Sequence, residues 1–371
     1  MVFGIGLVVN AVLVAIPIGG TVGALMGLDA HRAATGQKPL FTGGDNNDSG
    51  DIGTGGGSTG GGGSGGAATG QKPLFTGGDN NDSGDIGTGG GSTGGGGSGG
   101  GHNTVTNNGV ENTRYCDLSW GINPPSKTEQ FTLNPNQWGV TKDSTGNGLC
   151  MNITTLVNQT YAAQTAPEFS VTWQFDPGPE TSPVHGYPNI RVDDVLPKKM
   201  DQISELYLDL SWTYGVGDTV AASTDVTALS KENLATNVAI DMFLDADADN
   251  AKNGTQAKFE VMVWFWMSSV EAQPHGWGNP VMNRTLEGTE FKLYAGQNDN
   301  KQYVLSWVPE GAIEKFTGDI YPLITDLYNF GGSDYPARDD YLGSLSFGTE
   351  VYSVNSNVTF WAEKYKIDIK S

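Results

Sequence analysis

Apolar and polar positions alternate with a period of two in many short runs after residue 115, and Gly, Pro and Asn separate the runs. Strands are therefore predicted over residues 169–175, 206–212, 238–244, 259–267, 291–295, 303–308, 343–352 and 358–369. One stretch instead has helical spacing: it opens at Thr317-Gly318-Asp319 and continues with Ile320, Leu323, Ile324 and Leu327. Many short strands and one short helix predict a single all-β sandwich or jelly roll.

Alternation within the run 259–267 divides its side chains between two faces. The odd positions are uniformly apolar, so we expect them to face the core. The even positions are Glu260, Met262, Trp264 and Trp266. This second face therefore combines a carboxylate with polarizable and aromatic groups.

Two further runs present one acid each, opposite an apolar face. In 238–244 the even positions are apolar, and Asp241 lies on the other face between Ala239 and Phe243. In 343–352 the acidic residue is Glu350, which shares its face with Ser346, Gly348 and Tyr352. We expect the acids of the three strands to lie on equivalent faces.

A face of this kind suits a sugar, because a pyranose ring has an apolar side that stacks on Trp or Tyr and hydroxyls that bond carboxylates and amides. Two carboxylates facing each other could act as nucleophile and general acid/base. The alternative is a solvated outer sheet with scattered acids. The tryptophans beside Glu260 favour a cleft, since exposed tryptophan without a partner is unusual.

The first 32 residues differ from the rest, because residues 2–28 carry no charged side chain. Two interpretations compete. A secretory signal peptide fits the apolar stretch Leu7–Ile16 and the small residues Val22-Gly23-Ala24, although a positive n-region is missing. A membrane anchor fits the length, although Pro17, Gly19 and Gly20 interrupt it. Both place the following domain outside the cell.

The next segment is a duplicated spacer. Residues 33–66 recur without change as residues 67–100, and residues 33–101 hold 29 of the 55 glycines. Each unit offers only Leu, Phe and Ile as sizeable apolar groups, too few to form a stacked core. We therefore expect a flexible linker over 33–109, with the catalytic domain at 110–371. Calcium binding by its acidic GGDNNDSGDIG units is a less favoured alternative.

Charge and cysteine content exclude several classes. The formal net charge is −21, of which −17 falls on residues 110–371, so nucleic acid and anionic surfaces would be repelled while a neutral polymer would not. Two cysteines and four histidines make a structural zinc site improbable. Cys116 and Cys150 form either a disulfide, which an exported chain favours, or two buried thiols. Sequons at Asn47, Asn81, Asn152, Asn158, Asn253, Asn283 and Asn357 agree with export.

Six motifs in order resemble glycoside hydrolase family 12, the jelly-roll endoglucanases, over residues 113–370. Two resemble the strands that carry the reacting acids, namely Phe259-Glu260-Val261-Met262-Val263-Trp264 and Ser346-Phe347-Gly348-Thr349-Glu350-Val351-Tyr352. The others are Ile240-Asp241-Met242-Phe243, Tyr187-Pro188-Asn189, Asn136-Gln137-Trp138-Gly139 and Thr317-Gly318-Asp319. Val351 replaces a proline of the family pattern, which suggests a looser loop after Glu350, and Trp120 lies one place from the family's N-terminal cleft tryptophan.

The resemblance implies a retaining endo-β-1,4-glucanase that acts on cellulose-like glucan or xyloglucan in polysaccharide breakdown. Glu260 would be the nucleophile and Glu350 the general acid/base, with carboxyl groups ~5–5.5 Å apart, and Asp241 would support Glu260. Substrate would contact Asn136, Trp138, Tyr187, Asn189, Met262, Trp264 and Trp120. The resemblance also implies a Cys116–Cys150 disulfide.

The remaining chemistry is sparse. We expect a monomer without metal or cofactor, since no phosphate loop, dinucleotide fingerprint or Ser/His/Asp pattern is present, and His185 and His275 fall in loops. The acidic run Asp245–Asp249 departs from an EF-hand at Asn250 and Gln256, so a solvated turn is predicted. The competing function is a catalytically silent, wall-associated carbohydrate-binding protein on the same fold, against which the intact glutamate pair argues.

Overall fold

The computed structural model describes residues 103–107, 109–116, 121–123, 131–138, 148–156, 166–179 and 183–371. The predicted signal or anchor segment, both spacer units, Trp120 and the sequons at Asn47, Asn81 and Asn158 lie outside these residues. Within them, no helix combines the length and the apolar character that crossing a bilayer requires.

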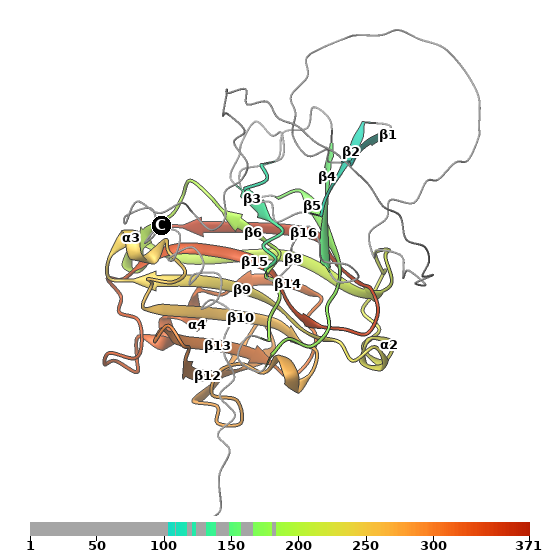
Figure 1. Ribbon diagram of the computed structural model, residues 1–371. Helices are drawn as coiled ribbons and strands as arrows, with labels where there is room; N and C mark the ends of the chain where they lie inside the picture. Colours follow the sequence, from blue (N-terminus) through green and yellow to red (C-terminus); the bar gives the residue numbers. More distant parts are fainter. Residues whose placement is uncertain are drawn as a thin grey trace, which may run out of the picture.

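Two β-sheets build the domain, as Figure 1 shows. The first has seven strands in the order β1 (Asn103–Asn107), β2 (Val110–Tyr115), β4 (Gly148–Leu156), β5 (Glu168–Gln174), β16 (Val358–Lys370), β8 (Glu205–Val216) and β14 (Lys315–Asp319). The first of these, β1, pairs with β2 along its whole length. Strand β1 thus lies inside the range 33–109 that was predicted to be linker, so the paired part of the chain begins earlier than predicted.

The second sheet has nine strands, eight of which follow one another across it. Their order is β11 (Met282–Leu286), β12 (Thr289–Gln297), β13 (Tyr303–Pro309), β10 (Phe259–Met267), β9 (Ala235–Asp245), β15 (Tyr341–Ser353), β6 (Asn189–Val192) and β3 (Phe131–Asn134). The short β7 (Lys198–Lys199) also pairs with β15. Among the described strands, only β10 and β13 run parallel to each other.

The main core lies between the sheets and is rich in aromatic side chains. Its largest members are fully buried, among them Trp173 and Trp212 of the seven-stranded sheet and Trp307 and Phe347 of the nine-stranded sheet. Phe347 packs edge-on against Phe360 across the interface, with ring centroids 6.1 Å apart. These residues lie at the alternate, apolar positions of their strands, so alternation alone assigns them to the core. All eight predicted strands are confirmed, several of them longer than predicted.

A β-bulge corrects one predicted face. The pairing of β10 with β9 slips between Trp264 and Trp266, because Trp264 lies opposite Ala239 whereas Trp266 lies opposite Val238. The extra residue reverses the alternation. Trp266 therefore turns into the main core, where it stacks on Trp212 with ring centroids 5.8 Å apart. The prediction that it shares the face of Glu260 is wrong.

The helices are short. They are α2 (Val226–Lys231), α3 (Ala248–Ala251), α4 (Tyr321–Leu327), and the 3₁₀ turns η1 (Met200–Gln202) and η2 (Val270–Ala272). The predicted helix is α4, and its buried residues Leu323, Ile324 and Leu327 are the ones that the spacing indicated. Its predicted opening is wrong, however, because Thr317-Gly318-Asp319 ends strand β14. Asp319 bridges the two elements: its carboxylate accepts hydrogen bonds from the backbone of Leu206 and Tyr321.

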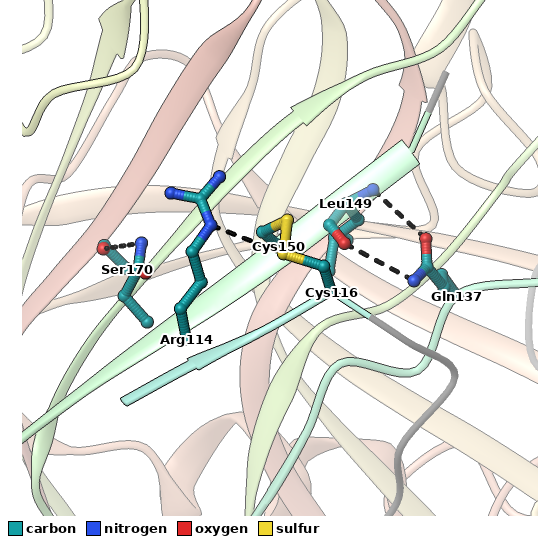
Figure 2. The surroundings of a disulfide bond; sticks show 7 residues. Arg114, Cys116, Gln137, Leu149, Cys150 and Ser170 are labelled. Carbon is teal, nitrogen blue, oxygen red and sulfur yellow. Dashed lines mark hydrogen bonds between the residues drawn. A yellow bond between two sulfur atoms is a disulfide. The ribbon is translucent and has the colours of Figure 1, made fainter. Parts of the chain in front are cut away.

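The disulfide between Cys116 and Cys150 is formed and joins the end of β2 to β4 (Figure 2). Beside it, Arg114 donates a hydrogen bond to the sulfur of Cys116. On the other side, the Gln137 side chain bonds both backbone groups of Leu149. The bridge therefore fixes the edge of the seven-stranded sheet where β2 and β1 are added to it, and Gln137 ties the nine-stranded sheet to the same point.

Removing this bridge should destabilise the domain. The disulfide closes a loop of 34 residues. Replacing both cysteines by serine should lower the free energy of unfolding by roughly 3–4 kcal/mol, because the unfolded chain regains loop entropy. Urea unfolding of the wild type and the double variant measures the difference, and wild type unfolded with reductant should match the variant. An unchanged midpoint would contradict a structural role for the bridge.

Candidate active site

Three acidic side chains share the face of the nine-stranded sheet that turns away from the main core. We call it the glutamate face, and its central strand is β9. The residues opposite one another are Asp241 with Met262 and Ser346, Glu260 with Phe243, and Glu350 with Asn237. Glu260 on β10 and Glu350 on β15 thus lie on a diagonal across β9, on either side of Asp241. All three predicted acids are brought together and buried.

Glu260 is held from the turn between β12 and β13. The amide of Asn298 donates a 3.4 Å hydrogen bond to Glu260 Oε2 and a 2.8 Å hydrogen bond to Gln302 Oε1. Gln302 returns a backbone hydrogen bond to Asn298 Oδ1 and anchors its own amide on the carbonyls of Gly254 and Ala257. Both amides are buried, so the orientation of Glu260 is fixed by a bonded framework.

Glu350 has different partners. The amide of Asn237 donates to Glu350 Oε2, and the hydroxyl of Tyr352 lies 3.5 Å from the same oxygen. The backbone of Glu350 is fixed as well, because its carbonyl accepts a 2.6 Å hydrogen bond from the hydroxyl of Thr236 and its N–H bonds Asn237 Oδ1. One donor from β9 and one from its own strand thus reach the same carboxylate oxygen of Glu350.

Asp241 lies between the two glutamates and is supported differently. Its Oδ1 is buried without a hydrogen-bond partner among the described residues. The charges of both glutamates raise its pKa. The ring of Tyr187 is held nearby, because its hydroxyl donates to the carbonyls of Ala239 and Ser346.

Burial dominates the ionisation of this group. It raises the pKa of Glu260 to about 7, against a lowering by the Asn298 hydrogen bond. It also raises the pKa of Glu350 to about 8, with the charge of Glu260 as the second cause. The pKa of Asp241 is raised well above its ordinary value by burial and then by the charges of both glutamates. The three therefore titrate as one coupled set, in which the charge of Glu260 opposes the ionisation of Glu350.

The segment 136–138 borders this face and is tied to the loop before β6. Trp138 donates its ring N–H to the carbonyl of Val184 at 2.6 Å and packs, half-buried, against a small cluster that includes Tyr352. Asn136 adopts a positive φ of 43°, and its carbonyl accepts a hydrogen bond from the backbone of Tyr187. Its buried Oδ1 has no partner among the described residues.

Asn189 uses its amide within the protein. It donates to the carbonyl of Tyr187 at 2.7 Å and accepts from Asn134 at 3.1 Å. The hydroxyl of Tyr187 likewise donates to two backbone carbonyls of the protein. The structure thus gives both residues a part in shaping the site, and substrate contact by them stays a prediction.

Met262 and Trp264 lie on the glutamate face, but other side chains cover them. Trp264 is 2% exposed and donates its ring N–H to the sulfur of Met262. Both belong to an apolar cluster with Ala239, Tyr294 and Val308. A contact between substrate and either residue therefore also stays a prediction.

Val351, where the family pattern has proline, does not loosen the chain. It is buried within β15 and bonds Gly186 through its N–H at 2.9 Å, a hydrogen bond that proline could not donate. Its carbonyl accepts the N–H of His185 at 2.8 Å. The expectation of a looser segment is thus wrong, because Val351 extends the pairing to the loop that carries Tyr187.

The remaining candidates have structural partners. His185 stacks on Phe175 with ring centroids 4.7 Å apart, and burial lowers its pKa. Burial also lowers the pKa of His275 to about 4. In the acidic run, the Asp247 carboxylate caps α3 and Asp245 accepts two backbone N–H groups, as in a turn. No group of three or more potential metal ligands occurs within the described part of the chain.

Sequence reasoning missed several of these residues. Asn237 could have been found, because it lies four residues before Asp241 on β9 and so faces the same side of the sheet. Asn298 and Gln302 could not, because their position depends on the parallel pairing that sets Tyr303 beside Phe259. The exposed ring of Trp277, on the loop before β11, also carried no periodic signal.

The family model of glycosyl hydrolase family 12 matches residues 129–370, which include all three acids. The chain belongs to glycosyl hydrolase family 12. It is accordingly a glycoside hydrolase, and its two-sheet jelly roll is the fold that the sequence predicted.

Curated relatives and solved structures agree with this assignment. A xyloglucan-specific endo-β-1,4-glucanase A of Aspergillus aculeatus is 28% identical over 242 residues, covering 65% of this chain and 86% of the relative. A probable enzyme of the same name from Aspergillus clavatus is 26% identical over 239 residues, covering 64% and 86%. The family 12 endoglucanase 3 of Trichoderma harzianum shares the fold with a TM-score of 0.53 at 20% identity, covering 69% of this chain and 97% of its own.

The catalytic domain of Humicola grisea Cel12A, solved with a soaked thio cellotetraose, shares the fold as well. Its TM-score is 0.51 at 24% identity, and the match covers 69% of this chain and 98% of that one. At this identity the likeness shows the fold, and the fold is what places the three acids of the family 12 chain on one face.

The buried carboxyls predict a pH-dependent stability. Because the folded pKa of Glu350 is raised to about 8, the folded state holds a proton that the unfolded chain releases near pH 4.5. The contribution of Glu350 to stability is therefore full below about pH 4.5 and falls as the pH rises to about 8, by roughly 1.4 kcal/mol per pH unit. Glu350→Gln should flatten this slope in urea unfolding measured from pH 5 to 8.

An exposed glutamate supplies the matched control. Glu271 on η2 is exposed, so Glu271→Gln should keep the wild-type slope. If Glu350→Gln and Glu271→Gln gave parallel curves, Glu350 would not carry a raised pKa in the folded state.

Proposed function

We propose that this family 12 enzyme is an endo-acting β-1,4-glucanase that cleaves neutral glucan with retention of anomeric configuration, in polysaccharide breakdown. The observation that carries the proposal is the pair of buried glutamates on one face, with pKa values displaced to about 7 and about 8. Paired carboxyls with separate protonation states are what a double displacement at a sugar requires. The names of the Aspergillus relatives supply the substrate class.

In this mechanism Glu260 is the nucleophile. The Asn298 hydrogen bond favours its charged form, and that charge in turn raises the pKa of Glu350. Its carboxylate attacks the anomeric carbon while the bond to the leaving oxygen breaks. The product of this step is a glycosyl ester on Glu260, with the configuration inverted once.

Glu350 is the general acid and then the general base. Its higher pKa keeps it protonated while Glu260 is ionised, so it delivers a proton to the leaving oxygen. It then takes a proton from the incoming water, which attacks the anomeric carbon and releases the Glu260 carboxylate. The second inversion restores the original configuration.

Asp241 supports the nucleophile through protonation. Because the charge of Glu260 raises the pKa of Asp241, ionisation of Glu260 favours the protonated form of Asp241. A neutral Asp241 also has a proton to donate, and its Oδ1 has no partner among the described residues. Asp241 is therefore proposed as the residue that holds Glu260 ionised.

Substrate recognition is proposed to involve Asn136, Trp138, Tyr187, Asn189, Met262, Trp264 and Trp120. The residue among these that best supports the proposal is Trp138, because its fixed indole borders Tyr352 beside Glu350. Trp120 lies outside the described residues.

The same proposal includes export. Residues 1–32 would act as signal peptide or membrane anchor, and the linker would give a monomeric domain reach outside the cell. The disulfide supports an oxidising compartment, and the sequon residue Asn283 is exposed on β11. The alternative is a catalytically silent carbohydrate-binding protein. It does not explain why three carboxyls are buried, which costs desolvation free energy.

The proposed roles predict different losses for the two glutamates. Glu260→Gln should lower the rate of hydrolysis of soluble β-glucan by about 10⁴-fold or more, because the covalent step is lost. Glu350→Gln should lose polymer hydrolysis but still transfer an activated aryl cellobioside, whose leaving group needs no proton. Azide should accelerate that variant by replacing base-activated water. Proton NMR of the first product should show the β anomer.

Glu310→Gln, at an exposed ion pair with Lys292, is the matched control and should retain wild-type rates. Formation of the α anomer would exclude retention. Substantial activity of Glu260→Gln would remove Glu260 as the nucleophile.

Substrate preference is the second test. Because both named relatives are xyloglucan-specific, the initial rate on xyloglucan should exceed that on carboxymethylcellulose by about tenfold or more, equivalent to about 1.4 kcal/mol of transition-state binding. Reducing-sugar release at equal mass concentration measures both rates. A faster rate on the unbranched polymer would remove the xyloglucanase assignment, and no release from either polymer would favour the silent binding protein.

A further inference from the structure

One aromatic pair outside the predicted site offers a flat, accessible surface on the glutamate face. Trp277 is 37% exposed and packs against the ring of Tyr294 at an interplanar angle of 35°, with ring centroids 5.0 Å apart. Tyr294 in turn belongs to the apolar cluster that covers Met262 and Trp264. Through Tyr294, the exposed Trp277 thus contacts the apolar cluster that reaches the strand of Glu260.

The loop that carries Trp277 is fastened to β12 at two points. Gly276 has a φ of 76° and lies so close to the strand that an added Cβ would be 2.3 Å from the carbonyl oxygen of Ala295. Gly296 allows the same approach from the strand, since a Cβ there would be 2.5 Å from His275 Cβ. The loop closes where Val281 donates to the carbonyl of Leu293 at 2.7 Å. Trp277 is therefore held in place before any ligand arrives.

Strand register connects this pair to the acids. Tyr294 lies opposite Ser306, Ser306 is paired with Met262, and Met262 lies opposite Asp241. The four residues form one row across the glutamate face, with Tyr294 three strands from Asp241. At a strand spacing of ~4.8 Å, β12 lies about 14 Å from β9 and about 10 Å from β10, the strand of Glu260, and both distances span more than one sugar unit.

We propose that Trp277, supported by Tyr294, is a stacking subsite for a sugar ring of the glucan chain, remote from the bond that is cleaved. The inference rests on the proposed function. An exposed indole held over a second ring presents the apolar face that a pyranose covers, and no rotamer freedom needs to be lost on binding. Because the subsite is remote, it acts on long substrates only.

The experiment compares polymeric β-glucan with an aryl β-cellobioside, which carries only two sugar units. Trp277→Ala should lower kcat/KM on the polymer about tenfold, mainly through KM, and leave the rate on the cellobioside unchanged. Trp277→Phe should keep most of the polymer activity. Trp277→Leu, which still covers Tyr294 but has no flat ring, should behave like Trp277→Ala.

Phe330→Ala is the matched control. Phe330 is also an exposed aromatic residue, 39% exposed, and stacks on a tyrosine, Tyr335, with ring centroids 4.5 Å apart, but this tyrosine packs against the main core. It should leave both rates unchanged. An unchanged polymer rate in Trp277→Ala, full activity of Trp277→Leu, or equal losses on both substrates would each overturn the subsite. Failure of the proposed function is distinct, because the wild type would then release no sugar from any β-glucan.

Discussion

The burial of three carboxyl groups side by side is the constraint on which the rest of this structure depends. Removing a carboxylate from water is costly, and placing a second charge beside it raises the cost further. The domain meets this cost by keeping protons on the group, so that burial raises the pKa of Glu260, Asp241 and Glu350 together. An arrangement that opposes ionisation in this way is unfavourable for folding and useful for proton transfer at a sugar.

Such a set must be held by the surrounding polypeptide, because its members repel one another when ionised. Each glutamate is bonded to a buried amide, Asn298 or Asn237, and each amide is anchored by further hydrogen bonds. Beneath Glu350, hydroxyl groups continue into the core, where Thr349 bonds both Tyr214 and Thr236. Polar groups of this kind are tolerated inside the sandwich because they satisfy one another.

Alternation along single strands was enough to predict an all-β sandwich or jelly roll and the shared face of the three acids, because strands and their faces follow from a period of two. It failed where a local event changes that period or where distant segments meet. The bulge after Trp264 reversed the face of Trp266, and no local signal marks it. The anchoring of Glu260 by Asn298 depends on which strand pairs with β10, which is a property of the whole sheet.

The bulge has a consequence for recognition. Because Trp266 turns into the core and Trp264 is covered, the strand that carries Glu260 offers little aromatic surface of its own. The exposed ring on this face belongs instead to Trp277, on a loop that packs closely against β12 because Gly276 and Gly296 lack side chains at the contact. Loops tolerate substitution better than paired strands. In the proposed enzyme, contact with distant sugar units can therefore change through the loop, while the register that aligns the three acids stays fixed.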